Sequence, residues 1–195
     1  RMVIALLLLS ITIVLLGLDV ALSFTQTMNL VFSAILDLVL GDSFLFRAFK
    51  DIGARISMLL MALVPAMTAL LAWGFLGESL SLQSIAGMAV TMTGITIVIL
   101  DRQPSADGSR SLNLRGIFLG ILAALGQASG LIFAKFALNE APIHGIVATF
   151  VRIAASVLIF LPIAALLKWY RNPFRTYAGD RKALSYTAIG AVIGP

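Results

Sequence analysis

The sequence predicts an all-α membrane protein, a bundle of helices that cross the lipid bilayer several times. The first observation is composition: of 195 residues, 60% are hydrophobic and 12% are charged, whereas soluble domains carry roughly 25% charged residues. The second is the length of the apolar runs, which reach the ~18 residues that read as a membrane helix. The third is their recurrence, because a signal peptide would supply only one run at the N-terminus.

Seven apolar segments follow one another along the chain, and we expect each to be helical. They are Arg1–Gly17, Asn29–Phe49, Ile52–Leu76, Leu82–Leu100, Arg115–Leu138, His144–Leu167 and Ala183–Pro195. The last segment is too short to cross about 30 Å of hydrocarbon. The longest polar stretch, residues 101–114, is predicted to be a cytoplasmic linker between residues 1–100 and residues 115–195.

Basic residues alternate from loop to loop along the chain. Arg47, Lys50 and Arg55 bracket the second turn, and others lie in the linker and in residues 168–182. Apart from Lys135, the intervening turns lack Lys and Arg. The positive-inside rule therefore places the basic loops on the cytoplasmic side of the membrane. We expect that membrane to be a bacterial inner membrane, which the chain crosses several times. Because topology accounts for the net charge of +5, no nucleic-acid partner is expected.

Several kinds of chemistry are excluded by composition. The chain has no cysteine, which excludes disulfides, thiolate metal sites and cysteine nucleophiles. Its single histidine, His144, cannot form a metal cluster alone. No nucleotide-binding loop is present either, so this chain is not expected to use ATP. We expect no metal and no other cofactor.

Two pairs of stretches repeat in character. "RMVIALLLLSITIVLL" from Arg1 is similar to "RIAASVLIFLPIAALL" from Arg152, and "SAILDLVLGD" is similar to "YTAIGAVIGP". The offsets span five helices, an odd number, so the two copies would face opposite sides of the bilayer. Inverted repeats of this kind are common in secondary transporters. Since Arg152 lies inside its helix, we expect Arg1 to be internal too, and the sequence to be a fragment of a longer chain.

The stretch "LVPAMTALLAWGFLGESLSLQSIAGMAVTMTGITIVIL" combines Pro65, the Gly77–Glu78 turn and the spaced glycines Gly87 and Gly94. It resembles the end of the first EamA repeat of the drug/metabolite transporter superfamily. "LGDSFLFRAFKDIGARISML" and "GIFLGILAALGQASGLIFAKFAL" resemble the third helix of that repeat and the opening helix of the second.

The resemblance implies that the seven segments are helices two to eight of ten in two inverted five-helix repeats. Residues 1–100 would hold helices two to five, and residues 115–195 helices six to eight. It further implies a non-enzymatic transporter that exports small metabolites or drugs by alternating access, with proton exchange as a driving force. The lipid bilayer and a small-molecule substrate are then the partners, and a homo-oligomer stays open.

Ionisable groups inside membrane helices are costly and are functional by default. Asp37, Asp42 and Arg152 are such groups, and they are candidates for a substrate cavity. The alternative for Asp42 is a structural ion pair with Arg152. Asp37 and Asp42 lie five residues apart, about 140° around an α-helix, so they are not expected to face one ligand together.

Three more features complete the candidate site. Pro65 should kink its helix, and with Thr68 on the same stripe it suits a substrate path as well as a packing kink. Gln127 lies within paired G-x-x-x-G motifs, Gly116/Gly120 and Gly126/Gly130, which predict close helix packing. Its amide could bond a neighbouring helix or a substrate. Glu78 is predicted to be structural, capping the helix that starts near Ser81.

Two other functions remain open. The basic residues 168–182 could attract a lipid-linked carrier, which makes a flippase an alternative. "VLGD" (Val39–Asp42) approaches the G-x-G-D motif of membrane-embedded aspartyl proteases but lacks its first glycine. Such a protease also needs a second carboxylate from another helix. Apart from Asp37, which lies on the same helix as Asp42, the remaining acids lie in turns or linkers.

Overall fold

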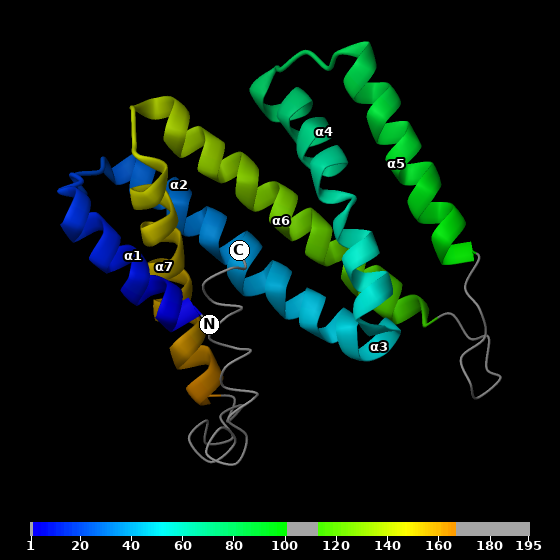
Figure 1. Ribbon diagram of the computed structural model, residues 1–195, viewed down its shortest axis with the longest axis horizontal. Helices are drawn as coiled ribbons and strands as arrows, with labels where there is room; N and C mark the ends of the chain where they lie inside the picture. Colours follow the sequence, from blue (N-terminus) through cyan, green and yellow to red (C-terminus); the bar gives the residue numbers. More distant parts are fainter. Residues whose placement is uncertain (1, 101–112, 167–195) are drawn as a thin grey trace. The chain divides into compact units, whose positions relative to one another are not determined.

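The computed structural model describes residues 2–100 and 113–166 (Figure 1). Its elements, in chain order, are α1 (Met2–Leu16), α2 (Phe24–Ala34), the π-helix η1 (Ile35–Gly41), α3 (Asp42–Met61), α4 (Val64–Leu76), α5 (Leu82–Leu100), α6 (Leu114–Glu140) and α7 (Gly145–Leu166). No strand occurs in these two ranges. Three described stretches are long and apolar enough to cross a membrane, namely Phe24–Met61, Leu114–Glu140 and Gly145–Ile163. The predicted all-α membrane bundle is confirmed.

The predicted segments agree with α1, α5, α6 and α7 to within a few residues. The other two described segments differ. The helix predicted to begin at Asn29 begins at Phe24, and the segment Ile52–Leu76 is divided at Ala62–Leu63. The segment Ala183–Pro195 and residues 101–112 lie outside the described residues.

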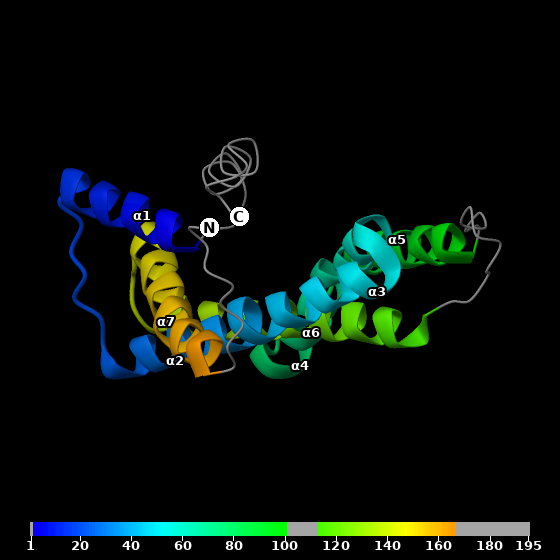
Figure 2. The ribbon, with the colours of Figure 1, turned by 90° about the horizontal axis from the view of Figure 1, so that it is seen from below.

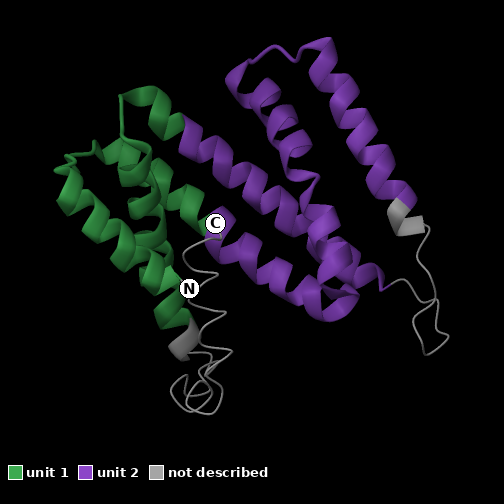
Figure 3. Ribbon diagram, viewed as in Figure 1, with its two compact units in different colours: residues 1–35, 136–195 green, residues 36–135 purple. Residues whose placement is uncertain are grey.

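The chain divides into two compact units (Figure 3). Unit 2 is the continuous stretch Leu36–Lys135, and unit 1 combines Arg1–Ile35 with Phe136–Pro195. Each unit therefore draws on both sides of the predicted linker. The division of the chain into two repeats stays a prediction.

Unit 1 is built by α7 packing against α1 and α2, around a core that includes Leu30 and Ala148. A capping box starts α2: the Ser23 hydroxyl accepts from the N–H of Gln26, whose side chain accepts in return from the N–H of Ser23. This signature, S-x-x-Q, was legible in the sequence and explains why α2 begins before the predicted residue.

Gln26 also joins α2 to the end of α6. Its buried side-chain amide donates to the carbonyl oxygens of Ala137 and Ala141, at 3.3 and 3.2 Å. The Ser23 hydroxyl donates to the Glu140 carboxylate at 2.8 Å. The last carbonyl groups of a helix have no hydrogen-bond donor within that helix. Gln26 supplies a donor to the carbonyl oxygens of Ala137 and Ala141 at the end of α6.

In unit 2, α6 lies alongside η1 and α3, as both views show (Figures 1 and 2). The two helices are antiparallel, since Gly126 lies against Leu36 and Gly41, and Gly116 lies against Asp51. A Cβ added to Gly126 would lie 2.8 Å from the Leu36 carbonyl oxygen, and one added to Gly116 would lie 2.7 Å from the Cβ of Asp51. The close approach predicted from these glycines is confirmed.

The other side of α6 packs against the chain that follows Gly53. A Cβ at Gly120 would collide with the Leu60 side chain, and Ala124 and Ala128 are fully buried in a cluster with Val64. Gly120 thus meets Leu60, and Ala124 meets Val64 four residues later, so on this side α6 and its partner run parallel. The chain therefore reverses between its two passes beside α6, and Gly53 is the point of reversal, with φ 80° and ψ 160°.

The Gly53 backbone lies in a region of φ/ψ space that only glycine occupies without strain, at a cost of about 1–3 kcal/mol for other residues. We therefore expect Gly53→Ala to destabilise the protein by about 2 kcal/mol. Unfolding in sodium dodecyl sulfate, followed by circular dichroism, measures the change. Gly74→Ala is the matched control, because Gly74 lies inside α4 with nothing within 4 Å. Equal stability of the two variants would contradict the strained reversal.

Candidate functional site

Pro65 interrupts the helix in which it was predicted to cause a kink. Proline cannot donate a backbone hydrogen bond, so the carbonyl of Met61 loses its usual helical donor. The N–H of Leu63 bonds the carbonyl of Leu60, only three residues back, at 3.0 Å. The helix consequently divides, and Pro65 occupies the first turn of α4, where its missing N–H costs little. The predicted kink is confirmed as a break between α3 and α4.

The positions of the charged residues on α6 indicate how deep each part of unit 2 lies in the lipid bilayer. Arg115 and Lys135 are separated by 20 residues (135 − 115) with no charge between them. At 1.5 Å per residue this is about 30 Å, the thickness of a hydrocarbon core. Residues near position 125 of α6 therefore lie near mid-depth.

Several of the predicted site residues share this depth. Gln127 lies near the middle of α6, and the packing of Gly41 against Gly126 and of Val64 against Ala124 brings neighbouring residues to the same level. These neighbours include Asp42 and Pro65. Arg152 belongs to unit 1, so its predicted pairing with Asp42 stays a prediction.

A cleft of about 410 Å³ runs between α4 and α6. It extends from the mid-depth residues Pro65 and Thr68 to the far end of both helices. Its wall is mostly apolar, and the lining residues are Val64, Pro65, Thr68, Ala69, Ala72, Glu78, Leu131, Ile132 and Lys135. Volumes of about 300–1,000 Å³ are typical of sites for small ligands.

Thr68 is the polar group at the inner part of the cleft. Its hydroxyl donates to the carbonyl oxygen of Val64 at 2.8 Å. A hydroxyl has one donor and two acceptor lone pairs, so Thr68 can accept a hydrogen bond from a ligand but has no further proton to donate.

The Gly77–Glu78 turn closes the other end of the cleft. Gly77 ends α4 in the left-handed conformation, with φ 67°, which glycine adopts without penalty. The N–H groups of Gly77 and Glu78 both donate to the carbonyl of Ala72. This places the Glu78 side chain beside α6, where its carboxylate forms an ion pair with Lys135.

The prediction that Glu78 caps the next helix is wrong. Ser81 caps α5, because its hydroxyl accepts from the N–H of Ser84 at 3.1 Å. Serine directly before the helix reaches that N–H more readily than a carboxylate three residues earlier, which leaves Glu78 for Lys135. The available signal was that Lys135 is the only basic residue near the predicted non-basic face.

Asp37 is buried within η1, with 7% of its surface exposed. The expected divergence of Asp37 and Asp42 by about 140° assumed an α-helix and is wrong here. A π-helix closes its turns between residues five apart, so the two carboxylates lie closer to one face. π-helical turns are frequent at functional sites, which keeps Asp37 a candidate.

Gln127 lies apart from the cleft. It is half-buried on α6, and its backbone nitrogen would lie 3.5 Å from a Cβ at Gly41, on the side of α6 that faces η1. Among the described residues, no group of three or more acidic or histidine side chains could hold a metal ion.

Long apolar helices, the buried carboxylate of Asp37 and a cleft that begins at mid-depth define a polytopic membrane protein. The family model of EamA-like transporters matches residues 1–100, just over half of the chain. The chain belongs to this family, and it is a membrane transporter of the drug/metabolite transporter type. Proteins of the family are in general not enzymes. Comparisons with curated proteins and with solved structures gave no match.

The Glu78–Lys135 ion pair should contribute a small coupling energy, because both side chains are about half exposed, at 44% and 42%. We expect a double-mutant cycle with Glu78→Gln and Lys135→Gln to give about 0.5 kcal/mol. The charge exchange Glu78→Lys with Lys135→Glu should restore most of it. The Asp51–Arg115 pair is the control, since its atoms are 3.7 Å apart and Arg115 is 77% exposed. A larger coupling energy for Asp51–Arg115 than for Glu78–Lys135 would contradict this prediction.

Proposed function

We propose that the protein exports small metabolites or drugs by alternating access, in a bacterial inner membrane, and that the α4–α6 cleft forms part of the substrate path. The observation that carries this proposal is the course of the cleft. It leads from the helix break at Pro65, near mid-depth, to the Glu78–Lys135 ion pair at the end of the helices. Transporters commonly bind substrate near mid-depth, where helices are discontinuous.

The lining of the cleft indicates the class of substrate. Apolar walls such as Ala69 and Leu131 would receive the apolar body of a small molecule. Thr68 would accept a hydrogen bond from an N–H or O–H group. The Glu78–Lys135 ion pair would meet a charged or strongly polar group. Small amphipathic molecules combine these properties.

The remaining polar candidate residues are the groups that could couple substrate export to proton movement. Asp37 is buried, Asp42 and Gln127 share the depth of Pro65, and Arg152 is half-buried in α7. Charged groups at such depth are retained where they serve ion or substrate movement. We assign Asp37 and Asp42 to proton exchange as the driving force, Gln127 to the polar wall of the path in unit 2, and Arg152 to substrate binding within unit 1.

The break between α3 and α4 supports the alternating-access part of the proposal. Residues at 62 and 63 lie outside both helices, so α4 can tilt without bending a continuous hydrogen-bonded helix. A tilt of α4 away from α6 would open the cleft toward Glu78. The opposite tilt would close that end and expose the mid-depth residues to the other side.

Filling the cleft should block transport without unfolding the protein. Cells that produce the protein should accumulate less ethidium, or release more of a particular metabolite, than cells that do not. Ala69→Phe should slow that export at least tenfold, because its ring would occupy the cleft. The rate of efflux, divided by the amount of protein in the membrane, is the measurement.

Ala89→Phe is the matched control, since Ala89 is exposed on α5 and lies outside the cleft. Export by Ala89→Phe should equal that of the unmodified protein. If Ala69→Phe exports as fast as the control, the cleft is not on the path. If neither ethidium nor any metabolite responds to the protein, the export proposal itself fails.

A further inference from the structure

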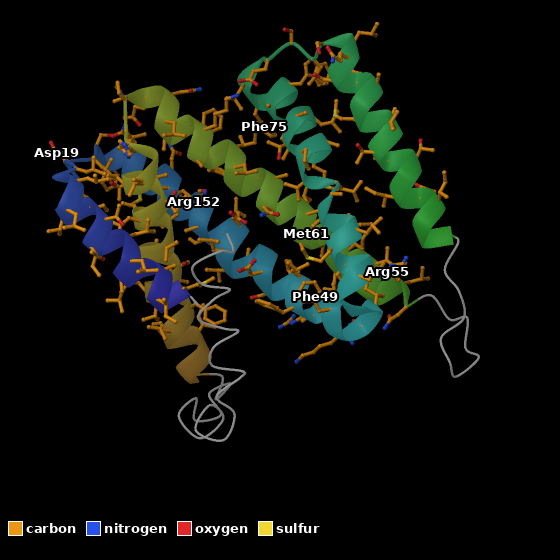
Figure 4. All side chains as sticks on the ribbon, viewed as in Figure 1. Asp19, Phe49, Arg55, Met61, Phe75 and Arg152 are labelled. Atoms are coloured by element: carbon orange, nitrogen blue, oxygen red, sulfur yellow. The ribbon has the colours of Figure 1, made fainter. Side chains whose placement is uncertain are left out.

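The reversal at Gly53 carries exposed cations that the proposed transport does not use. Arg47, Lys50 and Arg55 are exposed around it, and Lys50 and Arg55 form no ion pair with any described residue. Phe49 and Arg55 lie at the same end of unit 2 (Figure 4). We propose that this end binds the phosphate headgroup of an anionic phospholipid, with Lys50 and Arg55 as its principal ligands.

The direction of the helix surface supports this assignment. Ala48 and Ile52 are buried against α6 in one core cluster. At 100° per residue, Phe46 and Lys50 lie about 200° from Ala48 and so face away from α6. Lys50 is thus directed to the surroundings of unit 2, where a lipid can reach it.

The acid in this region does not neutralise the cations. The Asp51 carboxylate lies 3.7 Å from Arg115 Nε, and the Asp51 carbonyl accepts from the Asn113 side-chain amide at 3.5 Å. Asp51 is therefore occupied by the start of α6. Among the described residues no acid pairs with Lys50 or Arg55, so their charge is left for an external anion.

An apolar contact beside the cations distinguishes a lipid from a free phosphate ion. The rings of Phe46 and Phe49 pack edge to face, with centroids 5.9 Å apart, and Phe46 is 55% exposed. Phe46 and Lys50 are one helical turn apart, so ring and ammonium share a face. A phospholipid offers acyl chains to the rings and phosphate to the cations, whereas inorganic phosphate engages only the cations.

The depth of the region fits a headgroup. Asp51 packs against Gly116, one residue from Arg115 at the end of the 30 Å span estimated for α6. Lys50 and Arg55 thus lie at the level of the lipid phosphates. Each basic residue near an anionic membrane surface strengthens binding about fivefold.

Native mass spectrometry of the purified full chain in detergent tests the proposal, with titrated palmitoyl-oleoyl phosphatidylglycerol. Phosphatidylcholine with the same chains is the neutral comparison. We expect the anionic lipid to bind at least tenfold more tightly. The double variant Lys50→Gln, Arg55→Gln should lose about 25-fold, at fivefold per charge. Lys50→Arg, Arg55→Lys should retain binding, and circular dichroism checks that each variant is folded.

Arg102→Gln with Arg110→Gln is the matched control, because it removes the same charge from the linker; its loss should stay below twofold. An equal loss in this control would mean attraction by overall charge and would overturn the site. Displacement of the lipid by an equal concentration of inorganic phosphate would overturn the lipid assignment. Equal binding of the two lipids would overturn the proposal altogether. The test is independent of transport, so its failure leaves the proposed function standing.

Discussion

The close approach of backbones on both sides of α6 is the constraint on which unit 2 depends. Helices in a membrane gain nothing from hydrophobic burial against each other, since lipid is as apolar as their side chains. Their association rests on van der Waals contact, which small residues permit. Gly126 and Gly116 allow η1 and α3 to pack closely against α6. Ala124 and Ala128 do the same for α4. α6 is therefore a shared wall for two passes of the chain that run in opposite directions.

This packing also fixes the register that creates the site. Because Val64 packs against Ala124, Pro65 lies near mid-depth and the Gly77–Glu78 turn lies beside Lys135. Val64 also lines the cleft, and on α6 the lining residues beyond this contact are larger, namely Leu131 and Ile132. A shift of one turn would separate Glu78 from Lys135.

The sequence was sufficient wherever a local pattern determines the structure. Uncharged runs marked the helices, the glycine spacing marked the α6 contacts, and Pro65 marked the break. It was insufficient where a distant partner decides. Glu78 and Lys135 are 57 residues apart in the chain, and no local pattern pairs them. The π-helix around Asp37 likewise lies where Gly41 packs against Gly126, so a local α-helical angle was misleading.

The bonds from α2 to the end of α6 have a consequence for biosynthesis. Ser23 and Glu140 are 117 positions apart, and α7, which covers both α1 and α2, is made later still. At about 5–20 residues per second, the ribosome needs on the order of ten seconds to add that stretch. During this interval α1 and α2 wait in the translocon or in lipid without their final neighbours, whereas Leu36–Lys135 has been completed as one uninterrupted piece. The contacts of α2 with the end of α6, and of α1 and α2 with α7, therefore form only after residues 36–135 have been synthesised.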